Sequence, residues 1–404
     1  MRAFSPLFLL LSLGACSPSD GAPVRSSAGP FEMAQVGDFE EPWAIAFMAD
    51  GRALVTEKRG GLRIWRSNGP PVDVAGVPAV AYGGQAGLFD VAIAPDFAAS
   101  RMIYLTFAEG NPDGSSLALA RARLVEEGGA ARLEGLHVIW RQLPRGRGGH
   151  FGGIIAFSPD GRFLFLTAGE RQRFSPAQDP DLALGKVLRL TLDGRPAPGN
   201  PGEGRVGAST VTITDPPRNS GAALTAPGRR VQLPDPNLTP SETWTTGHRN
   251  LYGLAFGPDG RLWEHEMGPR GGDEVNLIER GRNYGYPFVS NGDNYDGTDI
   301  PDHPTRPEFQ APVLWWNPSV SPAGLIIYTG AMFPEWRGSG LMGAMSGRAL
   351  IRFAVEGAGA RKADHWDMEI PIRDVAQAPD GSVFLLEDGG DGPGRLFRLT
   401  PRRP

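Results

Sequence analysis

One short template recurs along the chain and restricts the folds that are possible. An apolar strand, an Asp-Gly pair and a second apolar strand follow one another at 44–57, 154–170, 253–266 and 374–388. Asp-Gly between alternating hydrophobic residues predicts a β-hairpin, whose favoured two-residue turn requires positive φ at both central residues. Two weaker copies, at 90–109 and 324–345, keep the flanking strands but change the turn. A repeated unit of this kind defines the whole architecture.

The six strand pairs predict an all-β protein, because hardly any segment between them has helical periodicity. Gly and Pro, 56 and 38 residues, are spread between short apolar runs, which is typical of turn-rich β proteins. We expect one domain over 31–404, a six-bladed β-propeller of four-stranded antiparallel sheets whose closed ring protects the sheet edges. A β-sandwich with coincidental turns is the alternative. Uneven spacing of the copies indicates long loops inserted on one face, the longest over about 171–245.

The N-terminus indicates export. Residues 1–15 carry one early positive charge and an apolar run too short to cross a bilayer, as in a signal peptide. The tetrapeptide Leu-Gly-Ala-Cys that ends at Cys16 resembles the bacterial lipobox, whose cysteine becomes the lipidated first residue of the mature chain. Residues 16–30 have the composition of a flexible tether. The resemblance implies a periplasmic protein anchored to a membrane, the outer one by its Ser17; a plain secretory signal is the alternative.

Charge and cysteine content exclude several classes of protein. The net charge of −5 provides no basic surface for nucleic acid, and contact with a membrane is expected only through the lipid anchor. Cys16 is the single cysteine, so an exported form of this chain has no internal disulfide. The six histidines lack the spacing of zinc ligands, which makes a zinc site the less favoured possibility.

Polar residues recur directly before the predicted strand pairs. Gln85 precedes the second copy, His150 the third, and Arg249 and Asn250 the fourth. Equivalent blade positions converge around the central channel of a propeller, so we expect these four side chains to share one pocket. His150 stands among glycines, which let a flat ligand approach the backbone closely. The alternative is a tight loop in which the histidine only caps a strand.

An acidic loop follows the fourth copy. Asp273 and Glu274 come after the loop Gly-Pro-Arg-Gly-Gly, and Tyr284 lies ten residues further on. Calcium takes six to eight oxygen ligands from carboxylates and backbone carbonyls at loops of this kind. The spacing differs from that of an EF-hand. The residues therefore leave two interpretations open, a calcium site and a solvated acidic loop.

Several segments together resemble the soluble pyrroloquinoline quinone (PQQ)-dependent sugar dehydrogenases, the glucose/sorbosone and aldose sugar dehydrogenase family. The likeness runs from about residue 40 to 400, and the combination of "GHRN", "GPRGGDEVN" and "NYGYP" is specific. The resemblance implies a six-bladed propeller that binds PQQ and Ca²⁺ in a cleft on one face. It also implies oxidation of aldoses at the anomeric carbon to lactones, with electrons passed on to an acceptor that the sequence does not identify.

The resemblance also implies roles for single residues around the quinone. His150 matches the catalytic base, which takes the proton of the anomeric hydroxyl while hydride leaves the carbon. Gln85, Arg249 and Asn250 match positions that contact the quinone, and Arg249 is suited to stabilising the developing negative charge. Arg373 matches an arginine that pairs with a cofactor carboxylate.

The same resemblance implies two calcium ions. The carbonyls of Gly268 and Pro269 match ligands of the calcium that bridges to PQQ. Glu274 and Tyr284 fall where a second calcium is bound, and Asp273 completes this predicted set of metal ligands.

The chain departs from the family pattern at four places. Gly149 replaces an acid that precedes the base in the glucose-type members, and Ser346 stands at the apparent place of a cofactor lysine. Pro371 replaces a second arginine, and Arg171 replaces a glutamine. PQQ carries three carboxylates, so the loss of two cations requires that Arg171 and Arg348 compensate.

Two other functions remain possible at this point. A calcium-dependent propeller hydrolase of the lactonase type would use a channel metal to polarise an ester, with His150 as the base. A non-catalytic, lipid-anchored propeller would bind a glycan or a protein partner.

Overall fold

A computed structural model describes residues 29–112, 114–215 and 226–402. The predicted signal peptide, Cys16 and nearly all of the predicted tether lie outside these residues. The described chain consists almost entirely of strands, and its α-helices are the four-residue turns α1 (Phe97–Ser100) and α2 (Thr239–Glu242). Neither is long or apolar enough to cross a membrane. The all-β prediction is confirmed.

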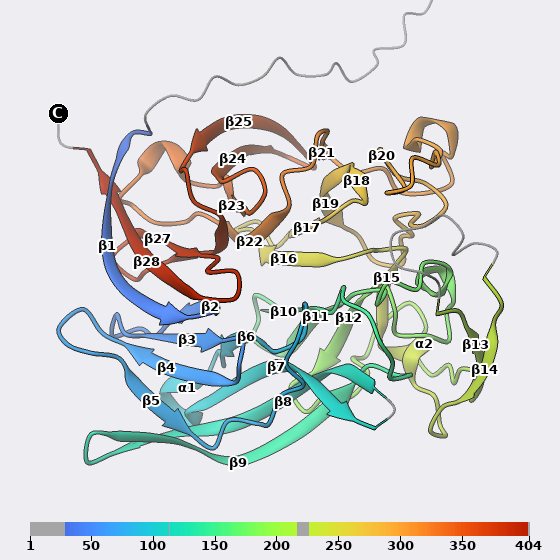
Figure 1. Cartoon of the computed structure of the whole chain (residues 1–404), viewed down its shortest axis with the longest axis horizontal. Coiled ribbons are helices and arrows are strands. Elements are labelled where there is room, and N and C mark those ends of the chain that lie inside the picture. Colours follow the sequence, from blue (N-terminus) through green and yellow to red (C-terminus); the bar gives the residue numbers. More distant parts are fainter. Residues whose placement is uncertain (1–28, 113, 216–225, 403–404) are drawn as a thin grey trace, which may run out of the picture.

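Four-stranded antiparallel sheets are the repeating unit of the fold (Figure 1). Three of them follow one another along the chain. The first contains β10 (Gly152–Phe157), β11 (Phe163–Ala168), β12 (Lys186–Thr191) and β15 (Thr243–Thr246). The second contains β16 (Leu251–Phe256), β17 (Leu262–Glu266), β19 (Asp273–Ile278) and β21 (Leu314–Trp316). The third contains β22 (Pro322–Ile327), β23 (Gly340–Ala344), β24 (Ala349–Glu356) and β25 (Gly359–Asp367).

Two further four-stranded units are joined into one eight-stranded sheet. The first unit has β2 (Pro42–Phe47), β3 (Ala53–Glu57), β4 (Gly61–Trp65) and β5 (Val72–Ala75). The second has β6 (Leu88–Ile93), β7 (Met102–Asn111), β8 (Gly114–Glu127) and β9 (Ala130–Arg141). The outer strands β5 and β9 join the units through a parallel pair, with Val74 opposite Ala131.

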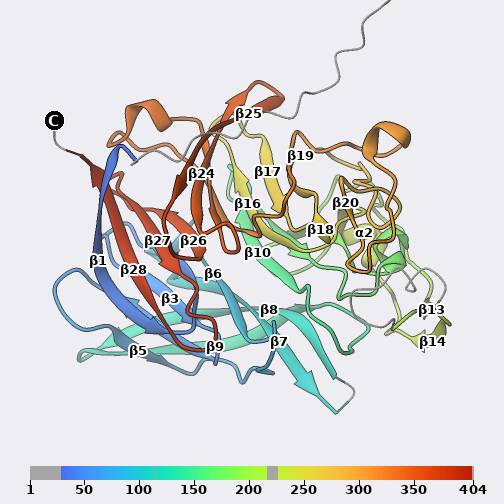
Figure 2. The same cartoon turned by 45° about the horizontal axis from the view of Figure 1, so that its top comes forward.

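The remaining sheet unites the two ends of the described chain. It contains β26 (Ile372–Gln377), β27 (Val383–Glu387), β28 (Pro393–Pro401) and β1 (Phe31–Glu40). The N-terminal strand β1 runs antiparallel to β28, with Phe31 opposite Pro401 and Glu40 opposite Pro393 (Figure 2). Backbone hydrogen bonds between the first and the last strand therefore close the fold.

The first strands of these units form a ring around a central channel. β2, β6, β10, β16, β22 and β26 each contact the next, and β26 contacts β2. Two carboxylates that face the channel bridge neighbouring strands of the ring: Asp374 accepts the N–H of Ile45 at 2.9 Å, and Asp90 accepts that of Ile155 at 2.8 Å. The ring strands line a cavity of about 370 Å³. This arrangement is a propeller-type fold.

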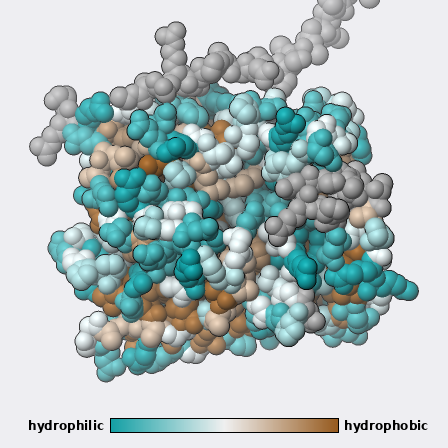
Figure 3. Space-filling view, viewed as in Figure 1, coloured by the Kyte–Doolittle hydropathy of each residue, from teal (hydrophilic) through white to brown (hydrophobic). Residues whose placement is uncertain are grey.

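Apolar residues fill the spaces between successive units. One core lies between the sheet of β6–β9 and that of β10–β15, around Phe89, Phe151 and Leu166. Another lies between the sheet of β16–β21 and that of β22–β25, around Trp263 and Phe353. On the face drawn in Figure 3 most of the surface is hydrophilic, and hydrophobic residues gather mainly over the eight-stranded sheet.

The Asp-Gly hairpins form as predicted but with a different turn. Only the glycines Gly51, Gly161, Gly260 and Gly381 have positive φ. In the first copy, Gly51 N–H donates to Met48 O at 3.0 Å and Met48 N–H to Arg52 O at 2.7 Å. This geometry is a type I turn followed by a left-handed glycine. The aspartate keeps ordinary φ because its carboxylate accepts the backbone N–H two residues on, as from Asp50 to Arg52 at 3.1 Å.

The predicted insertion at 171–245 is only partly an insertion. It contains β12 and β15, which are integral strands of their sheet, together with a separate ribbon of β13 (Thr210–Ile213) and β14 (Arg229–Gln232). A second inserted segment, between β19 and β21, is tied down by the short pair β18 (Arg270–Gly271) and β20 (Gly292–Asp293).

Candidate active site

The loops that precede β6, β10 and β16 meet at one end of the ring. The backbone N–H of His150 donates to Gln85 Oε1 at 2.6 Å, which joins the first two loops. The N–H of Glu170, just after β11, donates to the carbonyl of Arg249 at 3.0 Å and joins the second and third. The structure therefore brings these predicted residues together, as equivalent positions around a ring require.

A buried carboxylate holds the imidazole of His150. His150 Nδ1 is hydrogen-bonded to Glu170 Oε1, and both side chains are almost completely buried. The carboxylate of Glu170 also accepts the backbone N–H groups of Gln172 at 2.9 Å, Arg173 at 2.5 Å and Phe174 at 2.6 Å. Glu170 is thus a fixed anion, and it orients the ring so that Nε2 is the basic nitrogen.

Glu170 was missed by the sequence reasoning, although a signal for it was present. Glu57, Glu170, Glu266 and Glu387 all stand at or just after the end of the second strand of a repeat. Glu266 repeats the arrangement in the next unit, because its Oε1 lies 2.9 Å from His248 Nδ1 and its Oε2 accepts the N–H of Arg249 at 2.5 Å. In both units the acid after the second strand therefore holds the loop that precedes the first strand of the same unit.

The electrostatics favour a neutral imidazole. Burial lowers the pKa of His150, the nearby charge of Arg249 lowers it further, and Glu170 opposes both. Burial would raise the pKa of Glu170, but the hydrogen bond from His150, the charge of Arg249 and backbone N–H groups leave it below its ordinary value. His150 also has a φ of 52°, in the left-handed region that few non-glycine residues adopt. A strained, uncharged and anchored histidine is suited to act as a base.

The absence of a side chain at position 149 has a steric reason. A Cβ on Gly149 would lie 2.4 Å from Gln85 Oε1, far inside contact distance. The acid expected there from the glucose-type members has no space while Gln85 holds the N–H of His150. Glu170 supplies an acid to the imidazole from another strand.

Arg249 and Asn250 carry buried polar atoms that lack partners. Arg249 Nη1 donates to the carbonyls of Met267 at 2.9 Å and Gly268 at 2.7 Å. Among the described residues, Arg249 Nε and Asn250 Oδ1 have no hydrogen-bond partner although both atoms are buried. Leaving such an atom unsatisfied costs about 1–3 kcal/mol, so a ligand that supplied a partner to either atom would gain binding energy. The aromatic ring of Tyr295, 48% exposed and missed by the sequence reasoning, lies 5.8 Å from the Arg249 guanidinium.

Arg171 does not face this site. Its guanidinium is buried and donates to the carbonyls of Gly149 at 3.1 Å, Gly148 at 3.0 Å and Ser115 at 3.1 Å. It also stacks on the ring of Phe151 at 3.8 Å. We therefore correct the predicted role of Arg171: it supports the loop that carries His150, and its donors are not available to a cofactor carboxylate.

Two other predicted cations lie on different parts of the same face. Arg373 pairs with Asp388 at 2.6 Å and, together with Lys58, lines a cavity of about 140 Å³. Lys58 was not predicted. Arg348 is exposed and donates to the carbonyl of Glu369, while Ser346 binds the hydroxyl of Ser321 at 2.8 Å. Lys58 is therefore better placed than Arg348 to bind an anion together with Arg373.

Asp273 holds a loop and is not available as a metal ligand, which corrects its predicted role. Its Oδ1 accepts the N–H of Gly268 at 2.9 Å. Its Oδ2 accepts Ser319 Oγ at 2.7 Å, Val320 N–H at 2.6 Å and Ser321 N–H at 2.7 Å. These bonds fix the buried turn of Gly268 and Pro269, whose carbonyls are the predicted calcium ligands.

Glu274 and Tyr284 border the same small cavity but differ in what they offer a cation. The cavity has a volume of about 10 Å³, enough for one water molecule or ion. Glu274 is buried with its Oε1 3.4 Å from His303 Nε2. The hydroxyl of Tyr284 donates to Leu277 O at 2.5 Å and accepts Glu279 N–H at 3.0 Å. The phenol is therefore committed elsewhere, and Glu274 is the available side chain of the predicted pair.

These observations define a class of protein: a propeller with a carboxylate-held, buried histidine beside a cationic, partly unsatisfied pocket. Comparison with known proteins identifies the family. The model of the glucose/sorbosone dehydrogenase family matches residues 39–233 and 230–398. The chain belongs to this family.

Individual relatives extend the comparison. The aldose sugar dehydrogenase YliI of Escherichia coli strain K12 is 34% identical over 374 residues, covering 90% of this chain and 91% of the relative. A crystal structure of a glucose dehydrogenase has a TM-score of 0.78 at 38% identity and covers 91% of this chain and 99% of its own. The PQQ-bound aldose sugar dehydrogenase of Streptomyces coelicolor has a TM-score of 0.67 at 25% identity, over 91% and 98% of the two chains.

Proposed function

We propose that this protein is a PQQ-dependent oxidoreductase that oxidises the anomeric carbon of aldose sugars to lactones. The observation that carries the proposal is the hydrogen bond between His150 and Glu170, which creates a neutral base at the mouth of the ring in a chain of this family. A six-bladed count is part of the proposal, supported by the closed circle of first strands.

The residues present fit PQQ as a ligand. The unpartnered Arg249 Nε and Asn250 Oδ1 offer one donor and one acceptor to a flat polar molecule, next to Gln85. Arg373 is the cation that the resemblance implies for a cofactor carboxylate, and Lys58 beside it would replace one of the two that are missing at Ser346 and Pro371. The carbonyls of Gly268 and Pro269 would hold the accompanying calcium. When bound, the quinone supplies a two-electron acceptor for hydride.

The chain's own groups account for the proton transfer. His150 Nε2 accepts the proton of the anomeric hydroxyl as the carbon–hydrogen bond to C1 breaks and the C1–O double bond forms. Glu170 stabilises the resulting imidazolium through Nδ1. Arg249 places a positive charge near the base, where it disfavours premature protonation of the ring and favours negative charge on the reacting oxygens.

Two further proposals concern calcium and location. We propose that Glu274, with the backbone at Tyr284, borders a second calcium ion, because the cavity beside them is the size of one ion. We also propose a lipid anchor on Cys16 in the periplasm. The tether would join the domain at Phe31, the end of β1 remote from Glu41 and from the pocket that Glu41 shares with Arg373.

Reconstitution tests the proposed function. Purified protein with PQQ and Ca²⁺ should reduce an artificial dye when an aldose is added, and the His150→Gln variant should bind PQQ but reduce the dye slowly. Lactone hydrolysis without PQQ would instead support the calcium-dependent hydrolase. Neither activity, with glycan binding retained, would support the non-catalytic propeller.

A further inference from the structure

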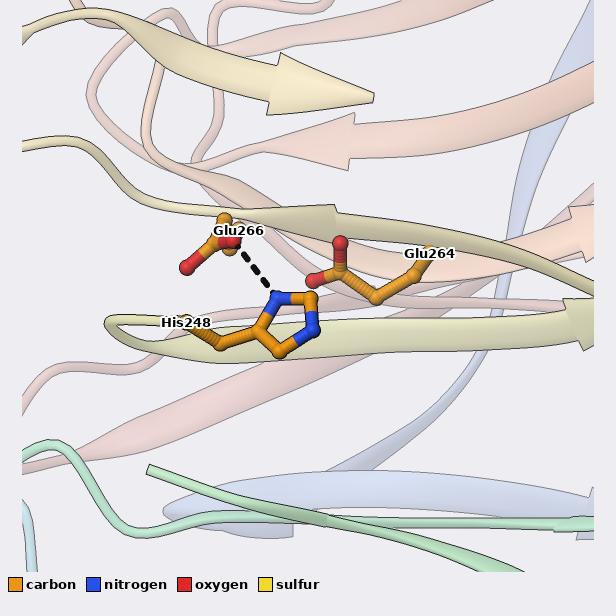
Figure 4. A group of neighbouring side chains, drawn as sticks. All are labelled: His248, Glu264 and Glu266. Carbon is orange, nitrogen blue, oxygen red and sulfur yellow. Dashed lines mark hydrogen bonds and ion pairs between the residues drawn. The ribbon is translucent and has the colours of Figure 1, made fainter. Parts of the chain in front are cut away.

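A second buried cluster of ionisable groups lies behind the proposed site. Glu264 and Glu266 are two residues apart on β17, so their side chains project from the same face of the sheet, toward His248 in the loop before β16 (Figure 4). The exposed fractions of His248, Glu264 and Glu266 are 0%, 0% and 4%. One ligand atom from each lies within 4.8 Å of the others. The proposed oxidation uses none of these three side chains directly.

The cluster contains oxygen atoms that nothing in the described chain satisfies. Glu264 Oε2 accepts Asn276 Nδ2 at 3.1 Å, but Glu264 Oε1 is buried without a hydrogen-bond partner. Asn276 Oδ1, on the neighbouring strand β19, is buried and unpartnered as well. A buried carboxylate with an unpaired oxygen next to a second carboxylate is strongly unfavourable unless a cation or a proton compensates it.

The geometry suits a metal ion. Ligand atoms on one zinc ion, bound at about 2.0–2.2 Å, are separated by about 3.3–4.4 Å, so three ligand atoms that lie within 4.8 Å of one another need to move by only a few tenths of an ångström to bind it. His248 Nε2 lies 2.9 Å from Thr245 Oγ1. If Nε2 carries the proton and donates it to this hydroxyl, Nδ1 presents a lone pair on the side of Glu266. One imidazole nitrogen and two carboxylates balance a dication, and a mixed nitrogen and oxygen set favours zinc or manganese over calcium.

We propose that His248, Glu264 and Glu266 bind a divalent transition-metal ion, with a ligand set different from that of the calcium positions at Gly268, Pro269 and Glu274, although Glu266 also borders the cavity beside Glu274. Glu266 also accepts the N–H of Arg249 at 2.5 Å. The ion would therefore help to fix the segment that carries Arg249 and Asn250. This inference does not depend on which substrate the enzyme oxidises.

Metal content provides the test. The purified full-length protein, stripped with a chelator and dialysed against Zn²⁺, Mn²⁺ or Ca²⁺, should retain one equivalent of Zn²⁺ or Mn²⁺, and that metal should raise its melting temperature. Glu264→Gln should lose both the equivalent and the thermal shift, whereas the matched variant Glu242→Gln, at a buried glutamate that accepts Trp140 Nε1 at 2.9 Å, should keep both. Retention of the metal by Glu264→Gln would overturn the proposal, as would a wild type that binds only Ca²⁺ or no metal.

A second measurement needs no variant, in case Glu264→Gln does not fold. Co²⁺ added to the stripped wild type should give visible absorption bands of a site with nitrogen ligation, and Zn²⁺ should abolish them. Absence of these bands in a folded protein would mean that a proton on Glu264, and not a metal, compensates the buried charge.

Discussion

Glu170 Oε1 and His150 Nδ1 form a buried hydrogen bond between residues 20 positions apart, one just after β11 and the other just before β10. The two strands form one antiparallel hairpin, so both ends of the pair return to the same face of the ring. The imidazole and the carboxylate that holds it therefore belong to a single repeat, while Gln85 and Arg249 come from the repeats on either side.

Replacement of His150 by Gln should separate binding from turnover. The amide has no basic nitrogen, so oxidation of the sugar should slow by about a hundredfold to ten-thousandfold, the usual contribution of a positioned base. PQQ and calcium should remain bound. Stopped-flow traces of quinone reduction in the loaded wild type and variant measure this; equal single-turnover rates at saturating sugar would exclude His150 from the chemistry.

Replacement of Glu170 by Gln should keep an acceptor for Nδ1 but remove the anion that stabilises the imidazolium. We expect the rate to fall by about a hundredfold or more, because orientation and charge of the acid both contribute in such pairs. The apparent pKa of the base should also fall, since Glu170 raises the pKa of His150. Rate–pH profiles of both proteins are the measurement, and an unshifted profile would contradict the role assigned to Glu170.

The pH dependence of the wild type follows from the direction of the His150 shift. Only the neutral ring accepts a proton, and burial together with Arg249 lowers the pKa of His150 below its ordinary value of 6.5. The value of kcat/KM should therefore reach half of its maximum at a pH below 6.5. A half-maximal rate above pH 6.5 would show that the ring is protonated more easily than its surroundings indicate.

Asp374, which bridges two repeats, should make the stability of the fold depend on pH. Burial raises its pKa from 3.8 to about 8. The protonated form is favoured in the folded state, so its contribution to stability is complete below pH 3.8 and is lost as the pH rises to about 8. Asp374→Asn should flatten the fall of melting temperature over that range. Asp90→Asn is the matched control: it should flatten the fall of melting temperature only up to the pKa of Asp90, about 6. Identical slopes of melting temperature against pH in wild type and Asp374→Asn would contradict the prediction.

Cys16 should determine where the protein is found. The wild type should partition with membranes as a lipid-anchored protein, and Cys16→Ser should leave a soluble or uncleaved precursor. Cell fractionation followed by mass spectrometry of the N-terminus measures both. Unmodified wild type in the soluble periplasmic fraction would disprove the anchor.

The repeated hairpins, the all-β class and the loops that carry Gln85, His150, Arg249 and Asn250 could be predicted from the sequence, because each depends on short-range patterns of apolar, turn and polar residues. The equivalent positions of the repeats were enough to predict that these loops converge. The repeated position of the acids at the ends of the second strands could also be found in the sequence, although Glu170 was not predicted as a site residue.

Only the tertiary structure decided which side chains are free to act. Asp273 and Arg171 look like site residues in the sequence. In the structure, however, the carboxylate of Asp273 accepts hydrogen bonds from four donors in neighbouring loops. The guanidinium of Arg171 donates to carbonyls of the His150 loop and of Ser115. Closure of the ring by β1 against β28 likewise joins segments from opposite ends of the chain. Hydrogen-bond partners that are far apart in sequence compete for each polar group, and that competition is settled only when the repeats pack around the channel.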